Sequence, residues 1–535
     1  MSRRRILLEN SEIDYSKEYL TFLAKENGTF KFSGNSISYT TDGVNWIALA
    51  NNTQTPTINA GQRISWKATL TPTSGSGIGR FSSTNAFEVE GNAMSLLYGD
   101  NFSGVTSLNG KLYGFTKLFC GCSKLTDANN LILPATTLTA NCYTSMFSGC
   151  TSLTTVPQLP ASTLTTSCYQ FMFASCTSLT TVPTDLLQAT NMGNYCYQQM
   201  FSNCTNLTNA PNLLATTLRE ACYKLMFNNC SNLTVVQSEL PATNLKKECY
   251  LQMFRGCTKL TTAPTICATT IDGVSACTSM FEACTSLKTV QNILQPTTLK
   301  ADCYSYMFSG CTSLTTAPQL PATTLAASCY SHMFYDCRSL TSVPSLPATN
   351  LIYSCYHSMV YRTGHLPDMT NIDLTNTNQA ANGCFAGLFS GTYLTDAQLR
   401  QYLPNMTLPA TSLSVTWCYQ QMFYRCSGFT IAPTIAATAL TNNCCAQMFA
   451  ACPNLESGPT LPAATLKTGC YKQMFQNSAK LKSITCLATN ISETDCTSNW
   501  TSGVASSGTF TKAASITSWG SGASGIPNGW TVQNA

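Results

Sequence analysis

Charge and histidine are scarce in this 535-residue sequence. Only 10% of its residues are charged and it holds three histidines, whereas ordinary domains carry about 25% charged residues. The formal net charge of +5 is spread thinly, without a basic stripe, which argues against a nucleic-acid partner. No Cys-x2-Cys pair accompanies the few histidines, so the usual zinc spacing is missing and we expect no metal or cofactor.

Long apolar runs are also missing. The first residues are basic, but only Ile6, Leu7 and Leu8 precede Glu9, whereas a secretory signal needs about 7–15 apolar residues. We therefore expect either that a signal has been removed or that the protein leaves the cell by another route. Because no stretch approaches the roughly 20 apolar residues of a membrane span, no membrane insertion is expected.

Groups for catalysis are few. His332 and His357 fall in variable polar positions, which predicts that they face solvent, and the cysteines near them have the spacing of core residues rather than of an ionised nucleophile. Asp368 and Asp373 are a conceivable carboxylate pair for glycoside hydrolysis, but nothing else in the sequence supports that reaction. The prediction is that the protein is not an enzyme.

One phrase recurs along the chain instead. From Cys303 it reads CYSYMFSGCTSLTTAPQLPATTLAAS, and from Cys329 it reads CYSHMFYDCRSLTSVPSLPATNLIYS. A period of about 26 residues is typical of a solenoid, in which each repeat buries its apolar face only against its neighbours.

Each repeat suggests two elements. Cys303, Met307 and Cys311 fall on one side of a helical wheel, which predicts a short amphipathic helix from Cys303 to Cys311. The threonine-rich residues after Leu314 suit a short parallel strand, and Pro318 must end it. The predicted fold class is therefore an α/β solenoid of leucine-rich-repeat type, with an N-terminal all-β domain and a C-terminal cap.

The 29 cysteines are expected to be reduced core residues rather than a disulfide framework. Eight residues along a helix span about 12 Å, and neighbouring helices lie about 8–10 Å apart. Both distances exceed the roughly 7 Å that a disulfide allows between Cα atoms. The predicted core ladder contains Cys142, Cys150, Cys168, Cys176, Cys222, Cys230, Cys303 and Cys311.

Composition shifts divide the chain into four parts. Residues 1–19 form an N-terminal arm, and residues 20–115 alternate apolar and polar residues between turn signals, which predicts a small antiparallel β-domain. Residues 116–495 form the solenoid, and residues 496–535 form an aromatic, glycine-rich cap over its exposed end. The glycine-rich run 75–79 is expected to be a loop rather than a phosphate site.

The motifs MFSGCTSLTTVPQLP (146–160) and MFSGCTSLTTAPQLP (307–321) resemble BspA-like leucine-rich repeats. The flanks of the solenoid look like those found with such repeats in proteins of gut bacteria and their phages. The resemblance implies a non-enzymatic recognition role. The leading hypothesis is a phage protein on the virion surface or tail, anchored to other virion proteins through its N-terminal region. The alternatives are a bacterial cell-surface adhesin and a passive decoration or spacer protein.

Two faces of the solenoid could bind a host polysaccharide or protein. One carries variable polar residues of the predicted helices, and the other carries rows of threonine, which could also serve only to keep a sheet soluble. A repetitive partner would suit repeated weak contacts on either face. The candidate residues are Gln199, Lys224, Tyr306, His332 and Gln420 on the first face, and Thr154, Thr180 and Thr315 on the second.

Overall fold

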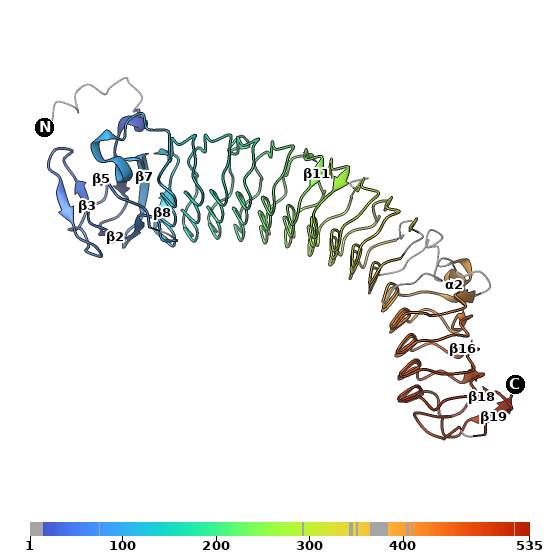
Figure 1. The fold of residues 1–535 in the computed structure, drawn as a ribbon. Helices are drawn as coiled ribbons and strands as arrows, with labels where there is room; N and C mark the ends of the chain where they lie inside the picture. The colour runs from blue at the N-terminus through green and yellow to red at the C-terminus, as the bar shows by residue number, and fades with distance from the viewer. Residues whose placement is uncertain are drawn as a thin grey trace. The chain divides into compact units, whose positions relative to one another are not determined.

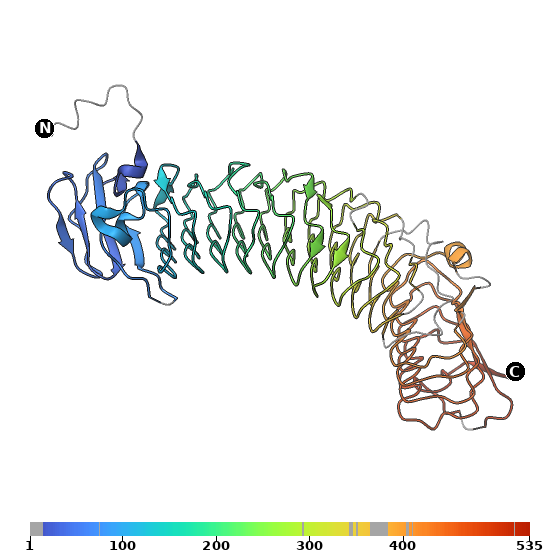
Figure 2. The same ribbon diagram turned by 45° about the horizontal axis from the view of Figure 1, so that its top comes forward.

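The computed structural model describes residues 14–73, 75–290, 294–341, 346–348, 351–363, 383–402, 406–408, 410–517 and 519–535. The fold is a β-solenoid, and the chain divides into two compact units, Met1–Gln237 and Ser238–Ala535. In both units the backbone winds in turns that lie side by side (Figures 1 and 2). His365, Asp368 and Asp373 lie outside the described residues, as does most of the predicted N-terminal arm.

The N-terminal β-domain packs two layers of strands around aromatic side chains. Phe22 lies 5.3 Å from Phe30 and 4.8 Å from Phe81 between ring centroids, and both of these rings come from the other layer. The larger sheet runs in the order β4-β3-β5-β1-β7, with antiparallel neighbours, and β2 pairs with β6. The strands are β1 (Leu20–Ala24), β2 (Phe30–Gly34), β3 (Ile37–Thr40), β4 (Ile47–Leu49), β5 (Arg63–Lys67), β6 (Gly79–Ser83) and β7 (Phe87–Asn92).

Strand β7 connects this domain to the solenoid. It pairs in parallel with β8 (Leu125–Asp127) and β9 (Leu131–Ile132), which belong to the first turn. The ring of Phe119 stacks between the rings of Phe81 and Phe147. The β-domain therefore covers the first turn, and one sheet crosses the predicted boundary near residue 115. Short helices η2 (Tyr15–Lys17), α1 (Ser95–Tyr98) and η3 (Gly99–Asn101) flank the sheet.

The prediction of a helix from Cys303 to Cys311 was wrong. Asp302, Tyr306 and Gly310 have φ values of 55°, 56° and 73°, so every fourth residue lies in the left-handed region. An α-helix cannot contain such residues. The segment is instead a run of tight turns, and the same left-handed positions recur in turn after turn of both units.

Backbone hydrogen bonds explain why this conformation is stable. Alternate residues donate their N–H to the next turn, as Tyr304 does to the Cys329 carbonyl at 3.0 Å. The residues between them bond three positions back, as Met307 does to the Tyr304 carbonyl at 3.2 Å. The buried N–H groups are therefore satisfied partly by the neighbouring turn, which makes one turn stable only within a stack.

The second half of each turn is extended, but it forms fewer regular strands than predicted. Pairing is often a single parallel bridge, as between Thr298 and Thr324, because proline removes backbone donors on both sides. The short strands of this half are β10 (Glu239–Leu240), β11 (Asn244–Leu245), β12 (Thr265–Ile266), β13 (Thr270–Ile271), β14 (Thr407–Leu408) and β15 (Thr434–Ile435). Helix α2 (Asp396–Tyr402) fills the insertion before β14.

The eight predicted ladder cysteines all have fully buried side chains. Their spacing differs from the predicted one: adjacent turns share backbone hydrogen bonds and lie about 4.8 Å apart rather than the 8–10 Å of packed helices. The cysteine that ends each run of tight turns also makes a hydrogen bond to the preceding turn. The thiol of Cys176 donates to the Phe147 carbonyl of the preceding turn at 3.2 Å, and Ser478 makes the equivalent bond to Phe449 at 2.8 Å. Burial raises the pKa of the Cys168 thiol to about 12.

The C-terminal end of the second unit is a four-stranded parallel sheet. It contains β16 (Ser457–Leu461), β17 (Ser483–Cys486), β18 (Thr509–Lys512) and β19 (Thr531–Asn534). The buried indole of Trp500 stacks on Tyr471 of the preceding turn and donates to the Gly525 carbonyl at 2.8 Å. The aromatic tail therefore covers the last core layer. Across the described ranges, no helix is long and apolar enough to cross a membrane.

Candidate functional site

The five residues predicted on the first face occupy two equivalent positions of the tight turns. Gln199, Tyr306 and His332 are left-handed residues with φ values of 55–56°. Lys224 and Gln420 each lie one position before the equivalent residue of their own turn. The structure brings Tyr306 and His332 into contact in the second unit. Gln199 and Lys224 are neighbours in the first unit, where the Gln199 N–H donates to the Lys224 carbonyl at 2.9 Å.

Aromatic and imidazole rings form a row across three successive turns of the second unit. The ring centroids of Tyr306 and His332 lie 4.4 Å apart with an interplanar angle of 7°. His357 follows at 4.8 Å from His332, with its ring turned by 72°. Beside them, the rings of Tyr335 and Tyr361 lie 4.7 Å apart and are nearly parallel. We call Tyr306, His332 and His357 the ring row.

A groove of about 300 Å³ continues from the ring row over the next turns. Its floor contains Gly383 and Ala386, where the chain has almost no side chain. The groove is lined by Ser328, Ser331, Tyr353, Ser354, His357, Gly383, Ala386, Trp417 and Gln420. We call this set the turn groove.

Exposure distinguishes the turn groove from the buried core. Tyr353 is 52% exposed and Trp417 is 43% exposed, although large aromatic side chains are usually mostly buried. Sequence reasoning found Gln420 but missed these two aromatic residues and the small floor residues. The available signal was a departure from the repeat: Trp417 occupies a left-handed position that holds serine at Ser167 and asparagine at Asn443.

The imidazoles of the ring row are held neutral. Burial, together with the neighbouring His357, lowers the pKa of His332 to about 4. Burial also lowers the pKa of His357. The His332 Nδ1 lies 2.8 Å from the Ser331 hydroxyl. Both histidines are half-buried, so the expectation that they face solvent was only partly right.

The nearby cysteines are poor nucleophiles. Burial raises the pKa of both Cys329 and Cys355 to about 12. A thiol with such a pKa carries almost no thiolate at neutral pH, so a Cys-His pair would not be activated here. Among the residues that the structure describes, no cluster of His, Cys, Asp or Glu could hold a metal ion.

The threonine rows have a structural use. The Thr154 hydroxyl donates to the Thr126 carbonyl of the preceding turn at 2.8 Å. The backbone carbonyl of Thr180 accepts a bond from the Thr208 hydroxyl at 2.9 Å. The backbone carbonyl of Thr315 likewise accepts a bond from the Thr341 hydroxyl of the next turn. These bonds link one turn to the next and stabilise the stack. They engage the hydroxyl of Thr154, whereas Thr180 and Thr315 take part through their backbone carbonyls.

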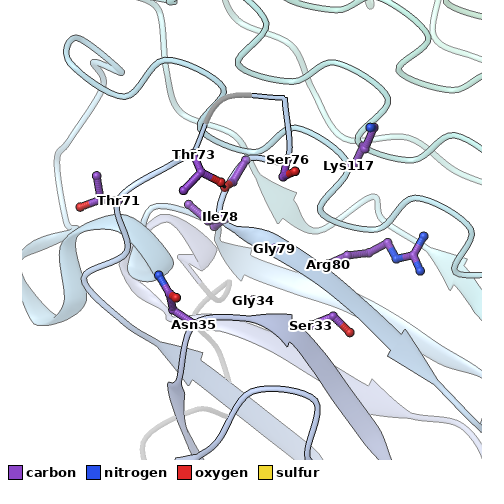
Figure 3. Close-up of a pocket in the computed structure, with 11 residues that line it drawn as sticks. Ser33, Gly34, Asn35, Thr71, Thr73, Ser76, Ile78, Gly79, Arg80 and Lys117 are labelled. Atoms are coloured by element: carbon purple, nitrogen blue, oxygen red, sulfur yellow. The ribbon is translucent and has the colours of Figure 1, made fainter.

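A second hollow lies in the N-terminal unit. It has a volume of about 350 Å³ and lies where β2, β6 and the loop 75–79 meet (Figure 3). Its cationic residues are Arg80 and Lys117, but Lys117 Nζ lies 3.4 Å from the Gly75 carbonyl and is held there. In Figure 3 the Arg80 side chain extends away from Asn35 and Thr71. Arg80 therefore does not reach toward the part of the hollow lined by Asn35 and Thr71.

The stacked turns and their inward-facing leucines define a solenoid of the leucine-rich-repeat class. The family model described as the BspA type leucine rich repeat region matches residues 116–261, 223–359 and 252–387. Together these matches cover residues 116–387, just over half of the 535 residues. The chain therefore belongs to the BspA-type leucine-rich repeat family.

One solved structure that this chain matches is a leucine-rich cell surface protein from Faecalibacterium prausnitzii. It is 15% identical, and the match covers 70% of this chain and 84% of that chain with a TM-score of 0.30. No curated protein matches this sequence.

Proposed function

We propose that this protein is a non-enzymatic recognition protein that acts at a cell surface, and that the second unit binds its ligand through the ring row and the turn groove. The family suggests a surface or recognition role. The observation that carries the proposal is the row of partly exposed rings from Tyr306 to His357, because aromatic rings supply much of the binding energy at recognition sites.

Binding by the full chain tests this proposal. The labelled protein is incubated with intact gut bacteria, with mucin and with polysaccharide extracted from the same bacteria, and bound protein is measured. We expect saturable binding to at least one of these surfaces, with weaker binding by the double variant Tyr306→Ser, His332→Gln. Serine and glutamine occupy the same position at Ser279 and Gln447, so this variant is designed to preserve the fold. Failure to bind any of the three would refute the proposal.

The absence of catalysis is part of the proposal. We expect no increase in reducing ends when the extracted polysaccharide is incubated with the protein, because the described residues place no activated nucleophile beside the rings. A steady release of reducing ends that survives further purification would overturn this reading.

Attachment to a phage particle is the second candidate location. The buried, protonated thiols such as Cys168 fit synthesis in a reducing cytoplasm, and the N-terminal region would then bind other virion proteins. Detection of the chain in purified particles would favour this location, whereas detection only in a bacterial envelope fraction would reject it. A passive spacer is the third candidate, and it predicts no saturable binding.

A further inference from the structure

We propose that the turn groove binds one ring of a neutral saccharide, stacked against Trp417 or Tyr353, and that the ring row extends the contact to further rings of the same chain. This inference rests on the proposed recognition function and names the chemical class of its ligand.

The shape of the groove comes from one turn with small residues. Gly383 and Ala386 stand where the preceding turn carries Ser354 and His357. The following turn carries Trp417 and Gln420 at the same two positions. Since successive backbones lie about 4.8 Å apart, the two larger turns stand about 10 Å apart on either side of the small one. A slot of this width admits a flat, ring-shaped ligand.

The chemistry of the walls suits a sugar ring. A saccharide ring presents C–H groups on its faces and hydroxyl groups around its rim. The electron-rich face of an aromatic side chain attracts C–H groups, and Trp417 and Tyr353 offer exposed rings. The Gln420 amide can both donate and accept hydrogen bonds. Ser328 and Ser354 also line the groove and carry hydroxyl groups, so the rim of the ring would find partners on more than one side.

The groove favours a neutral ligand. None of the nine described residues that line it is Asp, Glu, Lys or Arg, and the imidazole of His357 is kept neutral by burial. Among the described residues of the neighbouring turns, Asp336 pairs with two arginines, lying 3.0 Å from Arg338 and 3.8 Å from Arg362. An acidic sugar would therefore lose its hydration without gaining a cation, which costs free energy.

The direction of the ring row favours a chain over a single sugar. His357 belongs both to the groove and to the row, and the row continues through His332 to Tyr306 on the preceding turns. A saccharide held in the groove would therefore meet further rings along the stack. Several weak contacts on one linked ligand give a higher affinity than one contact alone.

The test uses the full chain and defined oligosaccharides. Maltotetraose, chitotetraose, xylotetraose and mannotetraose serve as neutral probes, and tetragalacturonate serves as the acidic probe. Saturation-transfer NMR detects binding and calorimetry measures affinity. We expect at least one neutral probe to bind and tetragalacturonate to bind at least tenfold more weakly.

Two substitutions test the location. Ala386→Gln fills the floor of the groove with a residue found at the equivalent position in Gln170 and Gln420, and Trp417→Ser removes the exposed ring. Each should weaken binding of the neutral probe at least tenfold. Ala446→Gln is the matched control, because Ala446 occupies the equivalent position, is equally buried and does not line the groove. Thermal melts of the two glutamine variants show whether the added side chain itself changes stability.

The outcomes separate this inference from the proposed function. If no neutral probe binds, or if both groove variants bind as well as the parent protein, the inference is overturned. Saturable binding to cells that Ala386→Gln leaves unchanged would retain the recognition function and reject the groove. Binding of neutral probes without binding to any cell, mucin or extract would support the groove and reject the proposed surface role.

Discussion

The pKa of His332 provides a direct check on the ring row. An imidazole ordinarily titrates near pH 6.5, and burial beside His357 lowers the pKa of His332 to about 4. At about 1.36 kcal/mol per pKa unit, this difference corresponds to at most about 3 kcal/mol, and the partial exposure of the ring reduces that figure. Above pH 6.5 the imidazole is neutral in both states. As the pH falls from 6.5 to 4, the unfolded chain binds the proton before the folded chain does. The free energy of unfolding therefore decreases over this pH range.

The assay is an NMR titration of the imidazole protons, which is practical because the chain has only three histidines. His332→Gln and His357→Gln assign the signals, and glutamine already occupies the His332 position of other turns at Gln421 and Gln447. We expect the His332 signal to titrate well below pH 6 and to move toward 6.5 in the His357→Gln variant. Titration of His332 near 6.5 in the parent protein would show that the rings are solvated and not stacked, and would refute the geometry of the row.

Three further predictions test the core. At pH 8 the native protein should expose at most two thiols to a thiol reagent, Cys120 and Cys267. The protein denatured without reductant should expose all 29 thiols. A lower count, caused by cysteines oxidised in pairs, would contradict the reduced ladder. Cys176→Ala should lower the free energy of unfolding by about 1–3 kcal/mol in urea, because the bond to the Phe147 carbonyl and core volume are lost, and Cys176→Ser should lose less. The Tyr169 hydroxyl is buried and has no hydrogen-bond partner among the described residues, so Tyr169→Phe should leave the urea midpoint unchanged or raise it. A decrease in the free energy of unfolding of more than about 1 kcal/mol would show that the hydroxyl has a bound partner.

The repeat and its inward-facing residues could be predicted from the sequence, but the backbone conformation could not. Cys303, Met307 and Cys311 recur every four residues, and over nine residues a period of four cannot be separated from the helical 3.6. The distinguishing signal lies between the apolar residues. Left-handed positions hold mainly serine, asparagine, glutamine and glycine, and Gly310 is one example.

The candidate site was predictable only in part. Tyr306 and His332 were identified as surface residues from their variable positions, and the structure adds that their rings stack. The turn groove escaped prediction because it depends on a difference between neighbouring turns rather than on the repeat itself. Gly383 and Trp417 each depart from the repeat pattern. Because their turns stack in parallel, the space left by the missing side chain of Gly383 lies beside the ring of Trp417.

This arrangement explains how one scaffold can carry a specific site. The stack is held by backbone bonds between turns, such as the one from Gly387 to the Gln420 carbonyl at 2.8 Å, and these bonds do not depend on side-chain identity. Outward positions are therefore free to change with little effect on the fold. A binding surface then needs two small residues in one turn and larger residues at the same positions of its neighbours. Gly383 and Ala386 have this relation to Ser354 and His357 on one side and to Trp417 and Gln420 on the other. Ala446 also lies between larger residues, Gln420 and Lys472, but its turn carries Asn443 at the position of Gly383. Exchanging the residues at both positions between turns should therefore move the groove along the stack without unfolding it.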